Sequence, residues 1–199
     1  MREASVIDQG TATGRHGSAT DLAFAQLSPR PWLASYPPGV PAEIDVESLG
    51  TLVDLFESSV AAFAERPAIL CFGSTMTYAA MGKQARALAS WLRAQGLAKG
   101  DRVAIMLPNV PAYAVALFGV LSAGGTVVNV NPLYTPREFS QQINDSGARF
   151  LIVLENFGAT VAGALADVSL ERVLLVGPGD GLGLKGRVVN LASRHVRKA

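Results

Sequence analysis

A glycine-rich segment near the carboxyl end of the sequence has the spacing of a dinucleotide-binding loop. Residues Gly181 to Gly186 read Gly-Leu-Gly-Leu-Lys-Gly, which matches the pattern G-x-G-x-x-G. In dinucleotide-binding folds the first glycine follows a strand directly, and an acidic residue about 20 positions later binds the ribose. Here about four residues separate the expected strand from Gly181, and the sequence ends at Ala199. We therefore predict a surface loop and keep a dinucleotide-binding domain as the weaker alternative.

The other reactive side chains predict neither a catalytic centre nor a metal site. His16 and His195 lie near the two ends of the sequence, where no rigid neighbour is expected to hold them in a pocket. Cys71 lies in an apolar run that ends at Phe72, which is typical of a small buried thiol and not of a nucleophile. The Cys and His spacing fits no zinc site, and no Ser, His and Asp arrangement suggests a hydrolase. We assign no catalytic, cofactor-binding or metal-binding residue.

The charge balance argues against a polyanionic partner. Seventeen Lys and Arg stand against sixteen Asp and Glu, a formal net charge of +1, so we expect no electrostatic footprint for nucleic acid or an anionic membrane. Hydrophobic residues make up 49% of the chain against 17% charged, a balance typical of a protein with a packed core. The single cysteine allows no intramolecular disulfide, which favours a cytoplasmic location.

The segment from Asn109 to Pro136 carries no charged residue and is long enough to span a membrane. A single helix through it would be interrupted by Pro111, by the pair Gly124-Gly125 and by Pro132. We predict instead a buried helix followed by a buried strand, as in the interior of a parallel-sheet protein.

Short apolar strands alternate with helices from Arg102 onward. This alternation is typical of βαβ units and predicts an α/β fold, a parallel βαβ sheet with helices on both faces. The expected strands are 103–107, 126–130, 150–154 and 173–176, and the expected helices are 111–122, 136–146 and 157–166. We predict a mobile tail over residues 1–28 and an α/β domain over residues 29–199.

The elements around this core are expected from capping signals and apolar periodicity. Thr51 and Thr135 each precede a helix whose third position is acidic, Asp54 and Glu138, which predicts reciprocal capping. The first of these helices is followed by a hairpin over 68–77 and by a helix capped by Thr77. The last expected elements are a glycine-rich loop over 177–186 and a helix over 188–198. The first helix, 52–64, is expected to bury one face made of Leu52, Val53, Phe56, Val60, Phe63 and Ala64.

Several joined motifs resemble the opening of AMP-forming acyl-CoA synthetases, the adenylate-forming superfamily. They are Thr77-Tyr78 with the helix after it, Lys99 to Asn109 (KGDRVAIMLPN), Ala116 to Gly125 (ALFGVLSAGG) and Asn129 to Thr135 (NVNPLYT). Two further stretches are similar to bacterial long-chain fatty acid CoA ligases, namely Trp32 to Pro41 (WLASYPPGVP) and the run from Asn131 to Ala148. The resemblance covers about residues 31 to 199.

This resemblance implies part of the large amino-terminal domain of an adenylate-forming enzyme. Such ligases convert a fatty acid, ATP and coenzyme A into acyl-CoA, AMP and pyrophosphate through an acyl-adenylate, with magnesium at the phosphates. The family's phosphate loop and carboxy-terminal lysine do not occur in this sequence, so the chain is expected to be an incomplete, inactive amino-terminal part that needs no cofactor of its own. Asn131 and Tyr134, at the end of a parallel strand, are the expected substrate-binding residues.

The resemblance also implies partners for the parent enzyme. These are fatty acid, ATP and coenzyme A, and no nucleic acid is expected. The expected location is the cytoplasm, where the enzyme could also associate peripherally with the inner membrane. A non-catalytic α/β interaction module is the alternative from a different class. In either case an apolar face left uncovered predicts self-association.

Overall fold

The computed structural model describes residues 30–196, in two separate units of chain. The first unit, which ends at Asp45, contains a 3₁₀ helix η1 (Pro31–Ser35) and an ion pair between Arg30 and Glu43. The second unit begins at Val46 and holds all the other elements. The tail predicted over residues 1–28 lies outside the described residues.

The second unit is a series of helices around two sheets. Its helices are α2 (Val46–Leu49), α3 (Leu52–Ala62), α4 (Tyr78–Ala94), α5 (Pro111–Ala123), α6 (Pro136–Ser146), α7 (Gly158–Ala164) and α8 (Gly183–Val196), with short 3₁₀ helices η2 (Glu155–Phe157) and η3 (Leu165–Asp167). Its strands are β1 (Pro67–Cys71), β2 (Ser74–Thr77), β3 (Arg102–Met106), β4 (Thr126–Asn129), β5 (Phe150–Leu154) and β6 (Arg172–Val176).

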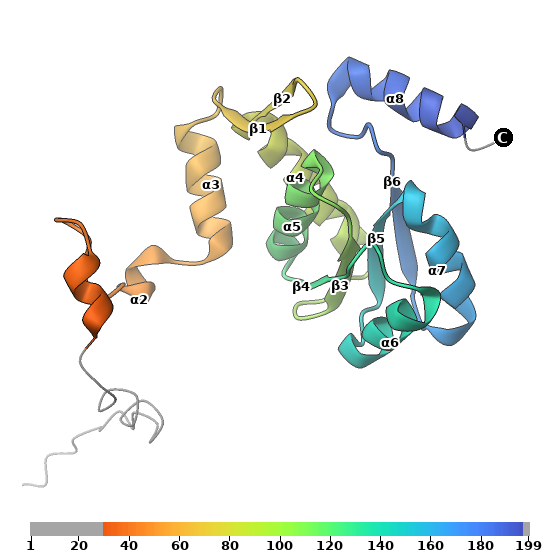
Figure 1. Ribbon diagram of the computed structural model, residues 1–199, viewed down its shortest axis with the longest axis horizontal. Helices are drawn as coiled ribbons and strands as arrows, with labels where there is room; N and C mark the ends of the chain where they lie inside the picture. Colours follow the sequence, from red (N-terminus) through yellow and green to blue (C-terminus); the bar gives the residue numbers. More distant parts are fainter. Residues whose placement is uncertain (1–29, 197–199) are drawn as a thin grey trace, which may run out of the picture. The chain divides into compact units, whose positions relative to one another are not determined.

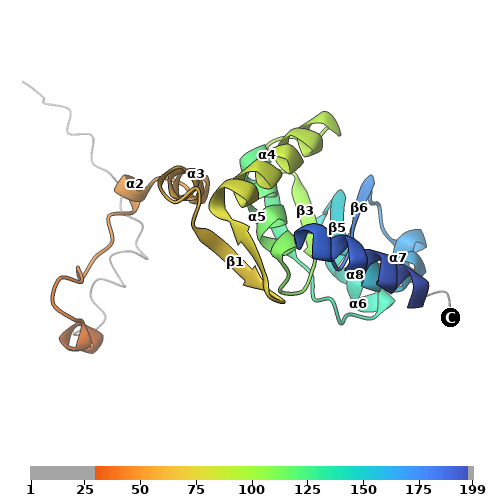
Figure 2. The same ribbon diagram turned by 90° about the horizontal axis from the view of Figure 1, so that it is seen from above.

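The main sheet has four strands in the order β4-β3-β5-β6, and every neighbouring pair is parallel. Helices α4 and α5 pack on one face, against Val103 and Ile152, while α6 and α7 pack on the other, against Ala104 and Val153 (Figures 1 and 2). The predicted α/β fold with a parallel sheet between two layers of helices is therefore confirmed.

The central strands are apolar along their whole length because both of their faces are covered. All five residues of β5 are buried, as are Val103 to Met106 of β3. The outer strands β4 and β6 keep partly exposed residues such as Leu175. A continuous apolar run is what a parallel strand inside a sheet requires, whereas an edge strand tolerates exposure.

Helix α5 occupies nearly half of the uncharged segment that could have spanned a membrane. It has 13 residues, and each of them is buried or half-buried between α4, α3 and the sheet. Gly119 permits its contact with α4, since a Cβ there would lie 2.8 Å from Cδ2 of Leu88. Among the helices of the described residues, none combines the length and apolar composition needed to cross a bilayer. The predicted buried helix is confirmed, but the predicted buried strand is wrong, because β4 lies at the edge of the sheet and its residues are half-buried or exposed.

The predicted capping boxes are also confirmed. The Thr135 hydroxyl accepts a hydrogen bond from the Glu138 amide, and the Glu138 carboxylate accepts one from the Thr135 amide at 2.9 Å. Thr51 and Asp54 do the same for α3. Helix α6 ends at Gly147, whose φ of 62° is the left-handed conformation that favours glycine. A cap of this kind contributes about 1 kcal/mol.

Three further predictions of the sequence analysis are wrong. Helix α3 buries only Phe56 and Val60, and Leu52 and Phe63 are exposed, because α3 contacts α4 and α5 along a narrow stripe. Cys71 is half-buried, since β1 and β2 form a separate hairpin and Cys71 lies at its tip. The last helix begins at Gly183, not at residue 188, so it takes up part of the predicted glycine-rich loop.

A charged network joins the amino ends of three parallel strands. Arg149, just before β5, donates to Asp101 before β3 at 2.6 Å and to both carboxylate oxygens of Glu171 before β6 at 2.6 and 2.7 Å. The Ala98 amide, and then Arg149, lower the pKa of Asp101 below its ordinary value, and hydrogen bonds from Arg149 lower the pKa of Glu171. The network therefore fixes the spacing of the strands at the edge opposite the β4–α6 loop.

We predict that Arg149→Ala lowers the melting temperature by a few degrees at neutral pH. Because the folded-state pKa values of both carboxyls are depressed, their contribution is complete above their ordinary pKa of about 4 and is lost as the pH falls through the lowered values. The gap between parent and variant should therefore narrow in acid, as measured by thermal melts from pH 7 to pH 3. Arg137→Ala, at an exposed position of α6, is the matched control, and a gap as wide at pH 3 as at pH 7 would contradict the assignment.

Candidate functional site

The strand order places a switch point at the carboxyl ends of β3 and β5. The connection from β3 to β4 runs through α5 on one face of the sheet, and the connection from β5 to β6 runs through α7 on the other face. The two loops leaving the adjacent strands β3 and β5 therefore turn to opposite sides. Open α/β sheets bind ligands in the crevice outside such carboxyl ends.

The two residues predicted to bind substrate lie in the loop between β4 and α6, at this carboxyl edge. The Asn131 side-chain oxygen accepts a hydrogen bond from the Leu133 amide at 3.0 Å, and the Asn131 carbonyl accepts one from the Tyr134 amide at 3.2 Å. Asn131 is exposed and holds the turn, while Tyr134 is half-buried against the α6 and α7 side of the core. Their role in binding stays a prediction.

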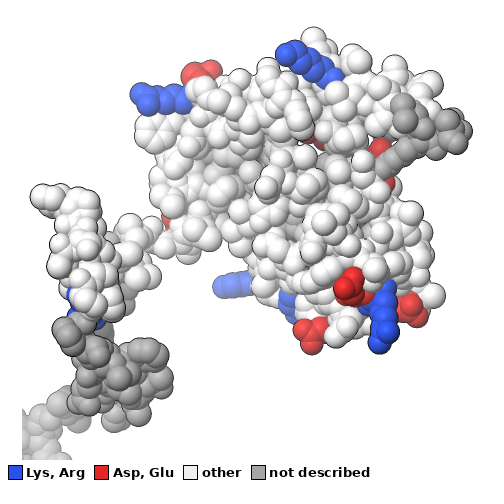
Figure 3. Space-filling model, viewed as in Figure 1, with Lys and Arg blue, Asp and Glu red and all other residues white. Residues whose placement is uncertain are grey.

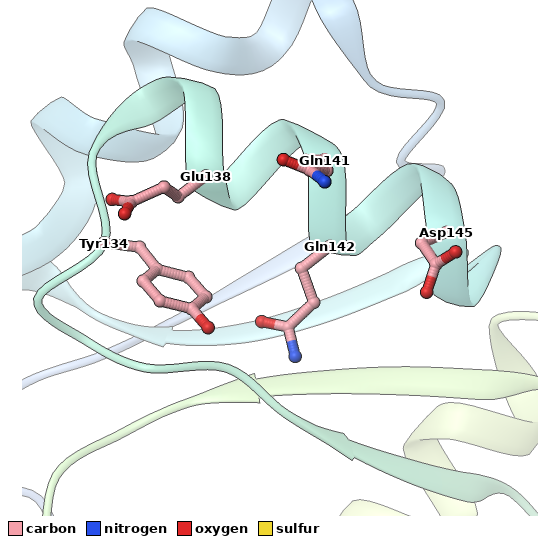
Figure 4. A pocket seen from close by; sticks show the side chains of 5 residues that line it. All are labelled: Tyr134, Glu138, Gln141, Gln142 and Asp145. Carbon is pink, nitrogen blue, oxygen red and sulfur yellow. The ribbon is translucent and has the colours of Figure 1, made fainter.

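Tyr134 lines a cavity of about 310 Å³ along α6, together with Glu138, Gln141, Gln142 and Asp145. Figure 4 shows the Tyr134 ring beneath the helix, with its hydroxyl directed toward the Gln142 side chain. Asn131 is not among the lining residues, so the structure brings only one of the two predicted residues into the cavity.

The cavity presents mainly hydrogen-bond acceptors. The Gln142 amide nitrogen donates to the Asn129 carbonyl at 2.9 Å, whereas its oxygen is buried without a partner among the described residues. The Glu138 carboxylate is held at the start of α6, where hydrogen bonds from the Thr135 amide and hydroxyl lower its pKa and keep it ionised. With a phenol, amides and carboxylates but no lining cation, the cavity can orient a ligand that donates hydrogen bonds.

Asn129, the last residue of β4, was not singled out from the sequence. Its side-chain oxygen accepts a hydrogen bond from the Tyr113 hydroxyl of α5 at 3.1 Å, and its carbonyl accepts the bond from Gln142 of α6. The end of the edge strand is thus held from both faces of the sheet, which fixes where the loop to Tyr134 begins. An asparagine at a strand end, two positions before Asn131, was the signal that could have found it.

The Gly181–Gly186 segment does not have the geometry of a dinucleotide loop. Gly183 and Gly186 lie in α8 itself, and β6 ends at Val176, so no tight turn joins the strand directly to the motif. Packing explains the glycine at Gly186, since a Cβ there would collide with the Gly179 carbonyl. Asn190 of α8 fixes the loop as well, because its oxygen accepts from the Gly179 amide at 2.7 Å and its nitrogen donates to Asp180 at 2.8 Å.

The remaining reactive residues do not join a site. His195 makes a contact of 2.9 Å between Nδ1 and the Leu191 carbonyl of its own helix, and His16 lies outside the described residues. In residues 30–196 no group of His, Cys, Asp and Glu has the arrangement of a metal site. The candidate site therefore consists of the carboxyl edge of the sheet and the cavity beside α6.

Comparison of the sequence with known proteins finds a family and several relatives. The family model described as "AMP-binding enzyme" matches residues 56–182. The long-chain-fatty-acid–CoA ligase of Escherichia coli O6:H1 is 46% identical over 169 residues, which are 84% of this chain and 30% of the ligase. The ligase of the same name from Bacillus subtilis strain 168 is 41% identical over 128 residues, or 64% of this chain and 23% of that protein. The chain thus spans at most about a third of these relatives.

Solved structures are similar to part of this chain as well. A long-chain-fatty-acid-CoA ligase from Archaeoglobus fulgidus has a TM-score of 0.59 and 27% identity, covering 63% of this chain and 27% of that one. A benzoate CoA ligase from Burkholderia xenovorans has a TM-score of 0.60 over 70% of this chain and 28% of that one, and at 24% identity it supports the fold alone.

We predict that Gly186→Ala destabilises the chain by about 1–3 kcal/mol, because the added methyl group meets the Gly179 carbonyl and forces α8 away from its loop. Gly158→Ala is the matched control, since Gly158 also lies in the first turn of a helix and a Cβ there has open space. Urea denaturation should show a lower midpoint for Gly186→Ala only. Equal midpoints for both variants would mean that the contact between Gly179 and Gly186 does not hold the helix.

Proposed function

Because this chain belongs to the AMP-binding enzyme family, we propose that it forms the amino-terminal part of a long-chain fatty acid CoA ligase. The proposed overall reaction joins a fatty acid to coenzyme A with conversion of ATP to AMP and pyrophosphate. The observation that carries the proposal is the 46% identity over 169 residues to a protein named for this activity. Activation through an acyl-adenylate is chemically reasonable, since a carboxylate resists attack by a thiol until one oxygen becomes part of a good leaving group.

The part that this chain plays in the reaction is proposed to be positioning. Transfer of an adenylyl group requires cations and backbone donors around the phosphates. Magnesium would need several carboxylate or phosphate oxygens, and residues 30–196 contain no suitable acidic cluster. We therefore assign no step through the metal to these residues, and expect the isolated chain neither to adenylate fatty acids nor to bind ATP tightly.

Asn131 and Tyr134 are proposed to shape one wall of the fatty acid site. Asn131 sets the turn after β4, and this turn presents Tyr134 to the cavity beside α6. A long acyl chain gains about 0.8 kcal/mol for each buried methylene group, so the Tyr134 ring, and not the carboxylates and amides that line the cavity with it, would contribute to selection by chain length. Asn131 would act through the loop, and Tyr134 by direct contact.

A cytoplasmic location with peripheral association at a membrane surface fits a substrate that dissolves in lipid. We also propose that the chain self-associates when the apolar surface of its second unit is left uncovered. Leu52 and Leu55 on α3 are 62% and 59% exposed, and they border an apolar groove of about 320 Å³ that includes Phe118.

The proposed activity can be tested by exchange of labelled pyrophosphate into ATP in the presence of palmitate. We expect no exchange by the purified 199-residue chain, and exchange within about tenfold of the parent rate by a chimera in which this chain replaces the matching 169 residues of the E. coli ligase. The corresponding chimera with the Bacillus subtilis segment is the control for the effect of replacement itself. Exchange by the isolated chain, or a folded but inactive chimera beside an active control, would contradict the proposal.

The role of Tyr134 can be tested in the active chimera. Tyr134→Ala removes the ring that lines the cavity, and we expect KM for palmitate to rise about tenfold, which corresponds to about 1.4 kcal/mol, with a smaller effect on KM for octanoate. Leu133→Ala is the matched control, because the neighbouring Leu133 is 84% exposed and lies outside the cavity. Equal KM values for parent and Tyr134→Ala would remove Tyr134 from the fatty acid site.

A further inference from the structure

Helix α8 has an outward apolar stripe that no described part of the chain covers. Leu184, Val188 and Leu191 are 78%, 68% and 61% exposed. They are spaced by four and three positions, so they lie on one face of the helix. Large aliphatic side chains in a continuous row are uncommon on a water-exposed helix, and they point to an apolar partner for this face.

The opposite face of α8 is fixed against the protein, which sets the direction of the stripe. Gly186 is buried against Gly179, and Asn190 hydrogen-bonds to the Gly179 amide and to Asp180. The helix cannot roll to bury the stripe without breaking these contacts. Figure 2 shows α8 lying across the carboxyl edge of the sheet, where its outward face is not covered by another element.

Basic residues flank the stripe on both sides. Since successive residues of an α-helix are separated by about 100°, Lys185 lies on one side of the Leu184–Leu191 row and Arg187 on the other. Residues 183–199 contain five Lys or Arg and no Asp or Glu, so the rest of the chain has twelve basic against sixteen acidic side chains. In Figure 3 a basic side chain projects from the upper margin beside α8.

The tip of the β1–β2 hairpin adds an aromatic side chain next to this helix. Phe72 is 86% exposed, and the Lys185 ammonium donates to the carbonyl of the adjacent Gly73 at 3.3 Å. Phe72 has a φ of 47° and Gly73 a φ of 67°, the combination of a type I′ turn in which asparagine and glycine are favoured. Phenylalanine thus occupies a strained position, with its ring in water and close to the start of α8.

We propose that Phe72, Leu184, Val188 and Leu191, with Lys185 and Arg187 beside them, form a docking surface for an anionic lipid bilayer. An apolar helical face bordered by cations binds in the interfacial plane of a membrane, with the aliphatic side chains among the acyl chains and the cations at the anionic headgroups. The exposed Phe72 ring, next to the Gly73 carbonyl that accepts from Lys185, would insert beside them. The surface deepens the peripheral membrane association proposed above and gives it a location.

Charge favours a bilayer over a second copy of this chain as the occupant. Two copies that paired through the same face in a symmetric dimer would bring Lys185 and Arg187 against their own like charges. Anionic headgroups instead compensate each basic residue, and contribute about tenfold or less in affinity per Lys or Arg near the surface. The proposal therefore requires a dependence on both lipid charge and salt.

The test is sedimentation of the 199-residue chain with vesicles of phosphatidylglycerol and phosphatidylcholine, without ATP, coenzyme A or fatty acid. We expect binding to vesicles with 30% phosphatidylglycerol at 50 mM salt, a loss of several-fold at 500 mM salt, and little binding to pure phosphatidylcholine. The double variant Val188→Glu, Leu191→Glu should bind at least tenfold more weakly. Leu165→Glu, at a 51% exposed leucine in η3, is the matched control and should bind like the parent.

The variant Phe72→Asn distinguishes a loss of vesicle binding from a loss of folding stability. It creates the Asn-Gly pair that type I′ turns favour, so it should keep or raise the melting temperature while it weakens vesicle binding by several-fold. Three outcomes would overturn the proposal. They are unchanged vesicle binding by the double variant, equal binding to neutral and anionic vesicles, and a dimer in sedimentation velocity that the double variant abolishes. Because no substrate is present, these outcomes are independent of whether the chimera catalyses exchange.

Discussion

The central sheet requires cover on both faces, and most of the structure is a consequence of this requirement. Strands β3 and β5 are parallel neighbours whose side chains are buried above and below the sheet. Parallel neighbours can be joined only by crossover connections, and the helices that make these crossovers supply the two covering layers. Right-handed crossovers then place α5 on one face and α6 on the other, because β4 and β5 lie on opposite sides of β3.

The two edges of this sheet have different roles. At the amino edge, Arg149 joins Asp101 and Glu171 in a network that fixes the strands relative to one another. At the carboxyl edge, loops leave the strands with few such constraints, and Asn129 holds only the beginning of the β4–α6 loop. A rigid base with variable loops above it is the usual arrangement for a ligand site in α/β proteins.

The proposed substrate and the proposed membrane surface are consistent with one another. A long-chain fatty acid partitions into lipid, and an enzyme that holds its carboxyl edge near a bilayer meets this substrate at a high local concentration. The net charge of +1 gave no indication of an anionic partner, because it sums the charges of the whole chain and hides a local excess of cations. The cations of residues 183–199 are offset by acidic residues elsewhere in the chain, so the asymmetry appears only when the charge is resolved along the chain.

The sequence by itself determined the features that depend on neighbours along the chain. The alternation of strands and helices after Arg102, the capping by Thr135 and the end of α6 at Gly147 follow from periodicity and from local hydrogen bonding, which the sequence records directly. The tertiary structure decided which side chains are covered. Leu52 and Cys71 look buried from their apolar surroundings, yet α3 and the hairpin each contact the rest of the unit along one side only. The surroundings of α8, which begins at Gly183, likewise depend on residues that are distant in sequence, such as Gly73, whose carbonyl accepts a hydrogen bond from Lys185.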